Sequence, residues 1–256
     1  MTDPAWRHRA IVVAFLALST GARANADCAF EPQGEGRVAA VVDGRSLRLD
    51  DGREIRLAGI ERAGTDSASR AALAAIVSGR HVALHGEDDA PDRYGRQPAF
   101  VFAEGSETSV QGEMLRRGEA LASAEVADKE CAAELAAAEK VARQGKLGIW
   151  AHPAAIKNAE SPGDILAGMG RFAVVEGRVL SVRQAGTVTY LNFGRNWTRD
   201  FAATISGRIM PAFEAAGLAP KSLENKRIRV RGYVGSRGGP RIELLRPGQI
   251  EVLGGT

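Results

Sequence analysis

Residues 41–64 alternate apolar and polar side chains on both sides of a tight turn at Asp51-Gly52. Neighbouring side chains of a strand point to opposite faces, so this pattern predicts two strands joined as a hairpin with one buried face. The chain is therefore constrained to build a β-sheet early in its first domain. The apolar positions of the hairpin are Leu47, Leu49, Ile55 and Leu57.

The following residues predict a mixed α+β arrangement. Apolar spacing and helix-end residues indicate three helices, and short β-branched or aromatic runs indicate two more strands. The predicted helices cover residues 67–77, 110–117 and 131–144, and the predicted strands cover 81–86 and 98–103. Just before the second of these strands, the motif Asp92-Arg93-Tyr94-Gly95-Arg96 places a tyrosine between two arginines.

In order and spacing, the hairpin and the Asp92–Arg96 motif resemble the thermonuclease family, whose best-known member is staphylococcal nuclease. The resemblance covers residues 37–150 and includes the closing run Lys146-Leu147-Gly148-Ile149-Trp150. It implies a small OB-type β-barrel with three helices. It also implies calcium-dependent phosphodiesterase activity on DNA or RNA.

The resemblance assigns roles to five positions. Arg56 and Arg96 fall where the family has its transition-state arginines, whose forked guanidinium groups suit phosphate oxygens. Glu61 falls at a metal-binding aspartate and is the acid left for catalysis. Ser46 takes the place of a threonine whose carbonyl binds calcium, and Asp43 is a further candidate ligand.

Two acids of the family are replaced. The aspartate expected after Asp43-Gly44 is Arg45, and the water-activating glutamate expected after the second strand is Gly64. Calcium prefers six to eight oxygen ligands with several carboxylates, and a guanidinium beside the ion repels it. Calcium is the cofactor that the resemblance implies, and these two replacements disfavour it.

Arg45 allows a different use of the same pocket. Together with Arg56 and Arg96 it would place three guanidinium groups around one phosphate, with Arg93 and Tyr94 at the rim, and no metal would be needed. The alternative is that Arg45 is a solvated turn residue paired with neighbouring aspartates.

The N-terminus is typical of a secretory signal peptide. Basic residues at positions 7–9 precede an apolar run over residues 10–18, and a small-residue stretch ends at Ala26. We expect cleavage after Ala26 and export to the periplasm or medium. No later stretch approaches about 20 apolar residues, so we expect no membrane insertion after cleavage.

Export places Cys28 and Cys131 in an oxidising compartment, where one intramolecular pairing is possible. A disulfide is therefore predicted, with two unpaired thiols as the alternative.

Charge divides the chain in two. Residues 27–169 hold 17 basic against 24 acidic side chains, whereas residues 170–256 hold 14 against 6. Such a division is expected when the basic half meets a polyanion or when the halves dock on each other. Prolines and glycines mark residues 151–169 as a linker between a domain over 27–150 and a basic domain over 170–256.

The basic domain predicts six short strands with one helix between the third and fourth, which favours a second small OB-like barrel. Its aromatic side chains are interleaved with arginines, as in single-strand binding surfaces. The alternative is that the aromatics are core and the arginines a solvated face. The candidate binding residues are Trp197, Arg199 and Arg229.

Three functions remain open from the sequence. The first is an exported thermonuclease-like protein that binds single-stranded DNA, RNA or another polyanion with little or no cleavage. The second is an active calcium-dependent nuclease that uses Glu61 with Asp43 or Asp66 in altered roles. The third is an envelope protein-interaction module.

Overall fold

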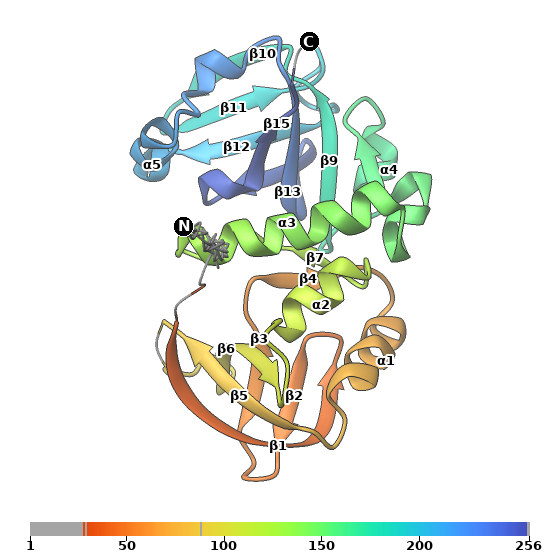
Figure 1. Ribbon diagram of the computed structural model, residues 1–256. Coiled ribbons are helices and arrows are strands. Elements are labelled where there is room, and N and C mark those ends of the chain that lie inside the picture. Colours follow the sequence, from red (N-terminus) through yellow and green to blue (C-terminus); the bar gives the residue numbers. More distant parts are fainter. Residues whose placement is uncertain (1–27, 29, 88, 255–256) are drawn as a thin grey trace, which may run out of the picture.

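The computed structural model describes residue 28 and residues 30–87 and 89–254, so the predicted signal peptide lies outside the described residues. The first domain is a closed barrel of five strands in the order β1-β2-β3-β6-β5 (Figure 1). Strands β3 and β6 pair in parallel, and the other neighbours are antiparallel. The strands are β1 (Glu31–Asp43), β2 (Ser46–Leu49), β3 (Glu54–Leu57), β5 (His81–Gly86) and β6 (Arg96–Ala103).

The predicted apolar alternation fills this barrel. Leu47, Leu49, Ile55 and Leu57 are each no more than 1% exposed and belong to one core cluster. The α+β fold with an OB-type barrel and three helices is thereby confirmed.

Three helices surround the barrel, each begun by a side chain that caps its first turn. Thr65, Ser109 and Asp128 accept hydrogen bonds from backbone amides of α1, α2 and α3, respectively. A short antiparallel pair, β4 with β7, lies between barrel and helices and was not predicted. The elements are α1 (Asp66–Val77), α2 (Val110–Arg116), α3 (Lys129–Gly145), β4 (Ile60–Arg62), β7 (Ala120–Ala122) and the 3-10 turn η1 (Gly148–Ala151).

Gly59 sets the sharp turn between β3 and β4. Its φ is +76°, and a Cβ there would lie 2.5 Å from a methyl of Leu135 and 2.7 Å from one of Val126. This close approach brings the start of β4 under α3, which buries Glu61.

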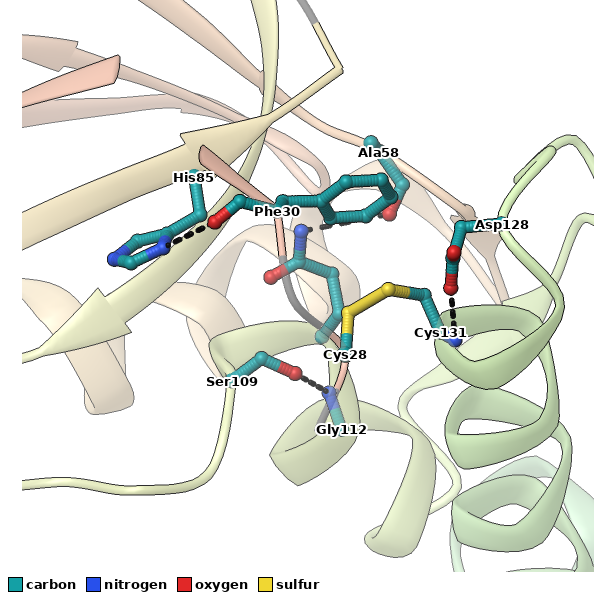
Figure 2. Close-up of a disulfide and its surroundings, with 9 residues drawn as sticks. Cys28, Phe30, Ala58, His85, Ser109, Gly112, Asp128 and Cys131 are labelled. Atoms are coloured by element: carbon teal, nitrogen blue, oxygen red, sulfur yellow. Dashed lines mark hydrogen bonds between the residues drawn. A yellow bond between two sulfur atoms is a disulfide. The ribbon is translucent and has the colours of Figure 1, made fainter. Parts of the chain in front are cut away.

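The predicted disulfide between Cys28 and Cys131 is confirmed. Figure 2 shows it at the first turn of α3, where the Asp128 carboxylate accepts a hydrogen bond of 2.8 Å from the Cys131 amide. Nearby, the ring of Phe30 packs 5.0 Å from that of Phe100. The bond therefore fastens the start of the described chain to α3.

The second domain is one sheet of eight strands in the order β10-β11-β12-β14-β13-β9-β8, with β15 beside β13. Only Val179 and Leu180 separate β9 from β10. The Val179 amide donates a hydrogen bond to the Lys226 carbonyl, next to β13, and the Leu180 amide donates to the Asn192 carbonyl at the end of β11. When β9 and β10 are counted as one bent strand, the strands of the second sheet follow the same spatial order as those of the first barrel. In both domains the third and last strands pair in parallel; in the second domain these are β12 and β14. This arrangement is OB-like, as predicted.

The elements of the second domain begin close to the predicted positions. The helical segment predicted at 207–216 is η3 followed by α5 (Figure 1). The bounds are β9 (Phe172–Arg178), β10 (Ser181–Ala185), β11 (Val188–Asn192), β12 (Ala202–Ser206), η3 (Gly207–Ile209), α5 (Met210–Ala215), η4 (Pro220–Leu223), β13 (Arg227–Arg237), β14 (Gly239–Leu244), η5 (Pro247–Gln249) and β15 (Ile250–Val252).

The segment predicted as a linker, residues 151–169, carries structure of its own. It contains η2 (Pro153–Ala155), β8 (Ile156–Asn158) and α4 (Pro162–Leu166). Strand β8 pairs in parallel with β9, and the Ile165 side chain is fully buried in the second core. This segment therefore extends the second domain.

Helix α3 lies between the two domains (Figure 1). A small apolar cluster joins Leu121, Ala142 and Trp150 of the first domain to Val174 of β9. None of the helices in the described part of the chain is long and apolar enough to cross a membrane.

One buried ion pair crosses the same interface. Arg231 on β13 donates to both carboxylate oxygens of Glu139 on α3, at 3.1 and 2.8 Å, and to the Ala122 carbonyl at 2.8 Å. The two charged side chains are 9% and 2% exposed. The acidic and basic halves of the chain thus dock on each other.

Candidate functional site

The hairpin of β2 and β3 places the candidate residues of the first domain at the rim of the barrel. Ser46 and Arg56 are cross-strand partners, and Arg45 precedes Ser46. The Arg45 carbonyl accepts from the Leu57 amide at 2.8 Å, and its amide donates to the Asp43 carboxylate at 2.8 Å. Asp43 therefore holds the turn.

Glu61 lies at the centre of the site and is 3% exposed. Its Oε1 accepts a hydrogen bond from the Arg45 guanidinium and lies 3.5 Å from Nη2 of Arg56. The same Nη2 is 3.5 Å from the Glu125 carboxylate. The predicted phosphate pocket is therefore an internal cluster in which two arginines share one buried carboxylate.

A tyrosine of the second domain completes the cluster. Tyr233 on β13 lies beside Glu61 and Arg45 and interacts electrostatically with both. Burial and the neighbouring Glu61 charge raise the pKa of Tyr233 above its ordinary value. Burial alone would lower the pKa of Arg45, but the Glu61 carboxylate raises it. Both groups are therefore held in their protonated forms.

The residues at this position do not fit a calcium ion. Calcium binds carboxylate oxygens at about 2.3 to 2.6 Å, and on Glu61 that place is taken by the Arg45 guanidinium. Asp43 is used by the turn, and Gly64 has no side chain to act on water. The Ser46 hydroxyl is buried and has no hydrogen-bond partner among the described residues. The Arg45 guanidinium is thus the positive charge beside Glu61.

The Asp92–Arg96 motif forms a separate turn. Both Nε and Nη2 of Arg96 donate to one oxygen of Asp92, at 3.0 and 2.7 Å, while the other oxygen accepts from the amides of Tyr94 and Arg96. Tyr94 is 65% exposed, and the guanidinium groups of Arg93 and Arg96 lie 4.8 and 5.1 Å from its ring centre. Arg96 is therefore engaged by Asp92, whereas Arg93 and Tyr94 face solvent.

Three of the four arginines on β13, Arg227, Arg229 and Arg231, are ion-paired. Arg229 lies between Glu176 at 2.8 Å and Glu251 at 2.6 Å, and its side chain is 12% exposed. Burial alone would raise the pKa of Glu251, but hydrogen bonds from Arg229 and the charge of Arg143 lower it. The guanidinium of Arg229, a predicted substrate-binding residue, is therefore covered and neutralised within the chain.

The loop between β11 and β12 is the exposed aromatic site of the second domain. Trp197 is 79% exposed, and Arg195 and Arg199 beside it are exposed as well. The Asp200 carboxylate accepts from the Asn196 amide at 2.8 Å and so fixes the loop. Within the described residues, neither of the two arginines takes part in a salt bridge. This loop keeps the free charge that Arg227, Arg229 and Arg231 of β13 lack.

Tyr233 and Glu139 are the residues that sequence reasoning missed. Tyr233 follows Arg227, Arg229 and Arg231 at the same two-residue spacing, so alternation could have placed it on their face of β13. No local pattern indicates that this face of β13 meets α3.

Residues 55–152 match the family described as staphylococcal nuclease homologue. No curated protein matches the chain. The resemblance read from the hairpin and the Asp92–Arg96 motif is thus confirmed, and the first domain contains a staphylococcal nuclease homologue region.

Proposed function

We propose that this protein is exported and binds single-stranded nucleic acid without metal-dependent cleavage. The observation that carries the proposal is the pairing of buried Glu61 with Arg45 at the position where the family implies a calcium ligand. The family match supports nucleic acid as the ligand class. The predicted signal peptide and the disulfide support export.

Loss of cleavage follows from the charges of the cluster. A divalent ion about 4 Å from the Arg45 guanidinium would meet a repulsion of several kcal/mol at an effective dielectric of about 20. A nuclease also needs a group that activates water within hydrogen-bond reach. Glu61 is the acid beside Arg45, and its carboxylate is engaged by Arg45 and Arg56.

Binding without a metal needs cations and aromatic faces that are open to solvent. Trp197 with Arg195 and Arg199 meets this requirement in the second domain, and Tyr94 with Arg93 meets it in the first. Base stacking on an aromatic side chain contributes about 1 to 3 kcal/mol per base. We therefore assign binding to these exposed residues.

The experiment incubates the mature protein with labelled single-stranded DNA and RNA, in calcium or in chelator, and scores both cleavage and retention. We expect retention that chelator leaves unchanged and that weakens with salt. The double variant W197A/R199A should lose retention. A matched control is L180A/R183A, which removes an exposed apolar and an exposed basic side chain elsewhere on the same domain.

Two outcomes would favour the other candidates. Calcium-dependent cleavage that Arg56→Ala abolishes would establish an active nuclease. Absence of both cleavage and retention would favour a protein-interaction module, the second candidate. The observation in favour of that candidate is the docking of the acidic and basic halves through Arg231 and Glu139, which accounts for part of the charge division without any nucleic acid.

A further inference from the structure

A cleft of about 1730 Å³ lies between the two domains, alongside α3. The first domain lines it with Arg56 and the loop that follows β7, and the second lines it with α5, β13 and β14. Small-molecule sites commonly enclose about 300 to 1,000 Å³. The cleft therefore has room for a segment of an extended polymer.

Helix α3 forms the floor of the cleft and contributes four alanines to it. Ala132, Ala133, Ala136 and Ala137 line the cleft; Ala132 is half-buried and the other three are exposed. Alanine has no side-chain rotamers to order when a ligand covers it. The floor can thus be covered at little entropic cost.

The walls carry an excess of free positive charge. Five cations that line the cleft take part in no salt bridge among the described residues, against two carboxylates, Glu87 and Glu243. The other charged lining residues, including Arg231 and Glu139, neutralise one another. The free cations are Lys129, Lys140, Arg208, Arg241 and Arg246.

Tyr233 supplies an aromatic face where the two domains meet. Its ring lines the cleft, the residue is 46% exposed, and Phe172 holds the ring edge-on at a centroid distance of 5.6 Å. Its hydroxyl end faces the charged side chains of Glu61 and Arg45 in the first domain. The ring is thus packed on one edge and half open.

We propose that this interdomain cleft binds single-stranded nucleic acid, with phosphates on Arg208, Arg241 and Arg246 and a base on Tyr233. The inference rests on the proposed function and adds a site to which both domains contribute. Arg241, which lines the cleft, is the cross-strand partner of Ala202, just after the Trp197 loop. One strand of nucleic acid could contact both.

Charge reversal tests the walls. The triple variant R208E/R241E/R246E should bind a 20-nucleotide oligothymidylate about 10-fold or more weaker than the parent protein, and the slope of log K against log salt should fall by about 2. The control R70E/R183E/K226E makes the same change of net charge at exposed arginines and a lysine outside the cleft. It should retain most of the affinity.

Two variants of Tyr233 test the stacking. Tyr233→Leu should weaken binding by about 5-fold to 150-fold, and Tyr233→Phe should leave it nearly unchanged because the ring remains. If both variants lose the same amount of affinity for the oligonucleotide, the missing hydroxyl beside Glu61 and Arg45 is the cause and stacking is refuted. Equal binding by the cleft and control triple variants would overturn the cleft site while the proposed function stands. If the parent protein retains no oligonucleotide, both the cleft site and the proposed function are refuted.

Discussion

The buried ion pair between Arg231 and Glu139 makes the strongest prediction about stability. In Arg231→Met, the Glu139 carboxylate keeps the Ala122 amide at 2.9 Å but loses both guanidinium hydrogen bonds. Arg143 lies 3.8 Å away, too far to replace them by hydrogen bonding. Removing one partner of a buried pair costs about 3 to 5 kcal/mol. For a chain of this size, that corresponds to a fall in Tm of about 6 to 20 °C.

The assay is urea unfolding followed by circular dichroism, arranged as a double-mutant cycle. The double variant R231M/E139L should recover part of the loss, because two apolar side chains leave no buried charge, while the Ala122 amide and carbonyl lose their side-chain partners. Arg227→Met is the control on the same strand, since the Arg227 side chain is 66% exposed and its pair with Glu176 contributes at most about 1 kcal/mol. A cost below about 1 kcal/mol for R231M, or a double variant as unstable as the sum of the singles, would refute the reasoning.

Calcium at 10 mM should leave the Tm of the parent protein unchanged relative to chelator. The Arg45→Asp variant should be less stable than the parent in chelator and should regain stability in calcium. An equal response of both proteins would contradict the conclusion that Arg45 keeps calcium from Glu61. Replacing Cys28 and Cys131 by serine should lower the free energy of unfolding by up to about 5 kcal/mol, since the bond closes a loop with a sequence separation of 103. The pKa of Asp92 is about 2, because hydrogen bonds from Arg96 and from the turn amides outweigh burial. Since this pKa is lowered from 3.8, its stabilisation is present above about pH 4 and is lost as pH falls to about 2. In acid unfolding curves, the Asp92→Asn variant should show a pH-dependent change in the free energy of unfolding that is about 1 kcal/mol smaller than that of the parent protein.

Elements with a clear period could be predicted from the sequence. The strand over His81–Gly86 has the predicted bounds, and α1 begins one residue before the predicted helix. Strands β4 and β7 are three residues each, too short for alternation to be recognised, and they are fixed by pairing with each other. Local pattern therefore predicts long elements and misses pairs that form only in the folded chain.

The site was harder to predict than the fold. Alternation correctly puts Arg229 and Arg231 on one face of β13, but it cannot say what covers that face. Their partners, including Glu176 and Glu139, are far away in sequence. The role of Glu61 likewise depends on Arg45 and on a tyrosine from another domain. Residue type predicted which groups carry charge, and only tertiary contacts decide which charges stay free.

The bond between Cys28 and Cys131 also determines how the protein would bear mechanical tension. A pull applied through the start of the described chain passes across the disulfide directly into α3, so the residues between the two cysteines carry none of it. That loop would otherwise lengthen by roughly 350 Å when stretched. Helix α3 then transmits the tension to the second domain through Glu139 and Arg143. While the bond is intact, the first barrel cannot be unravelled from its ends, and the tension falls on α3 and the residues after it.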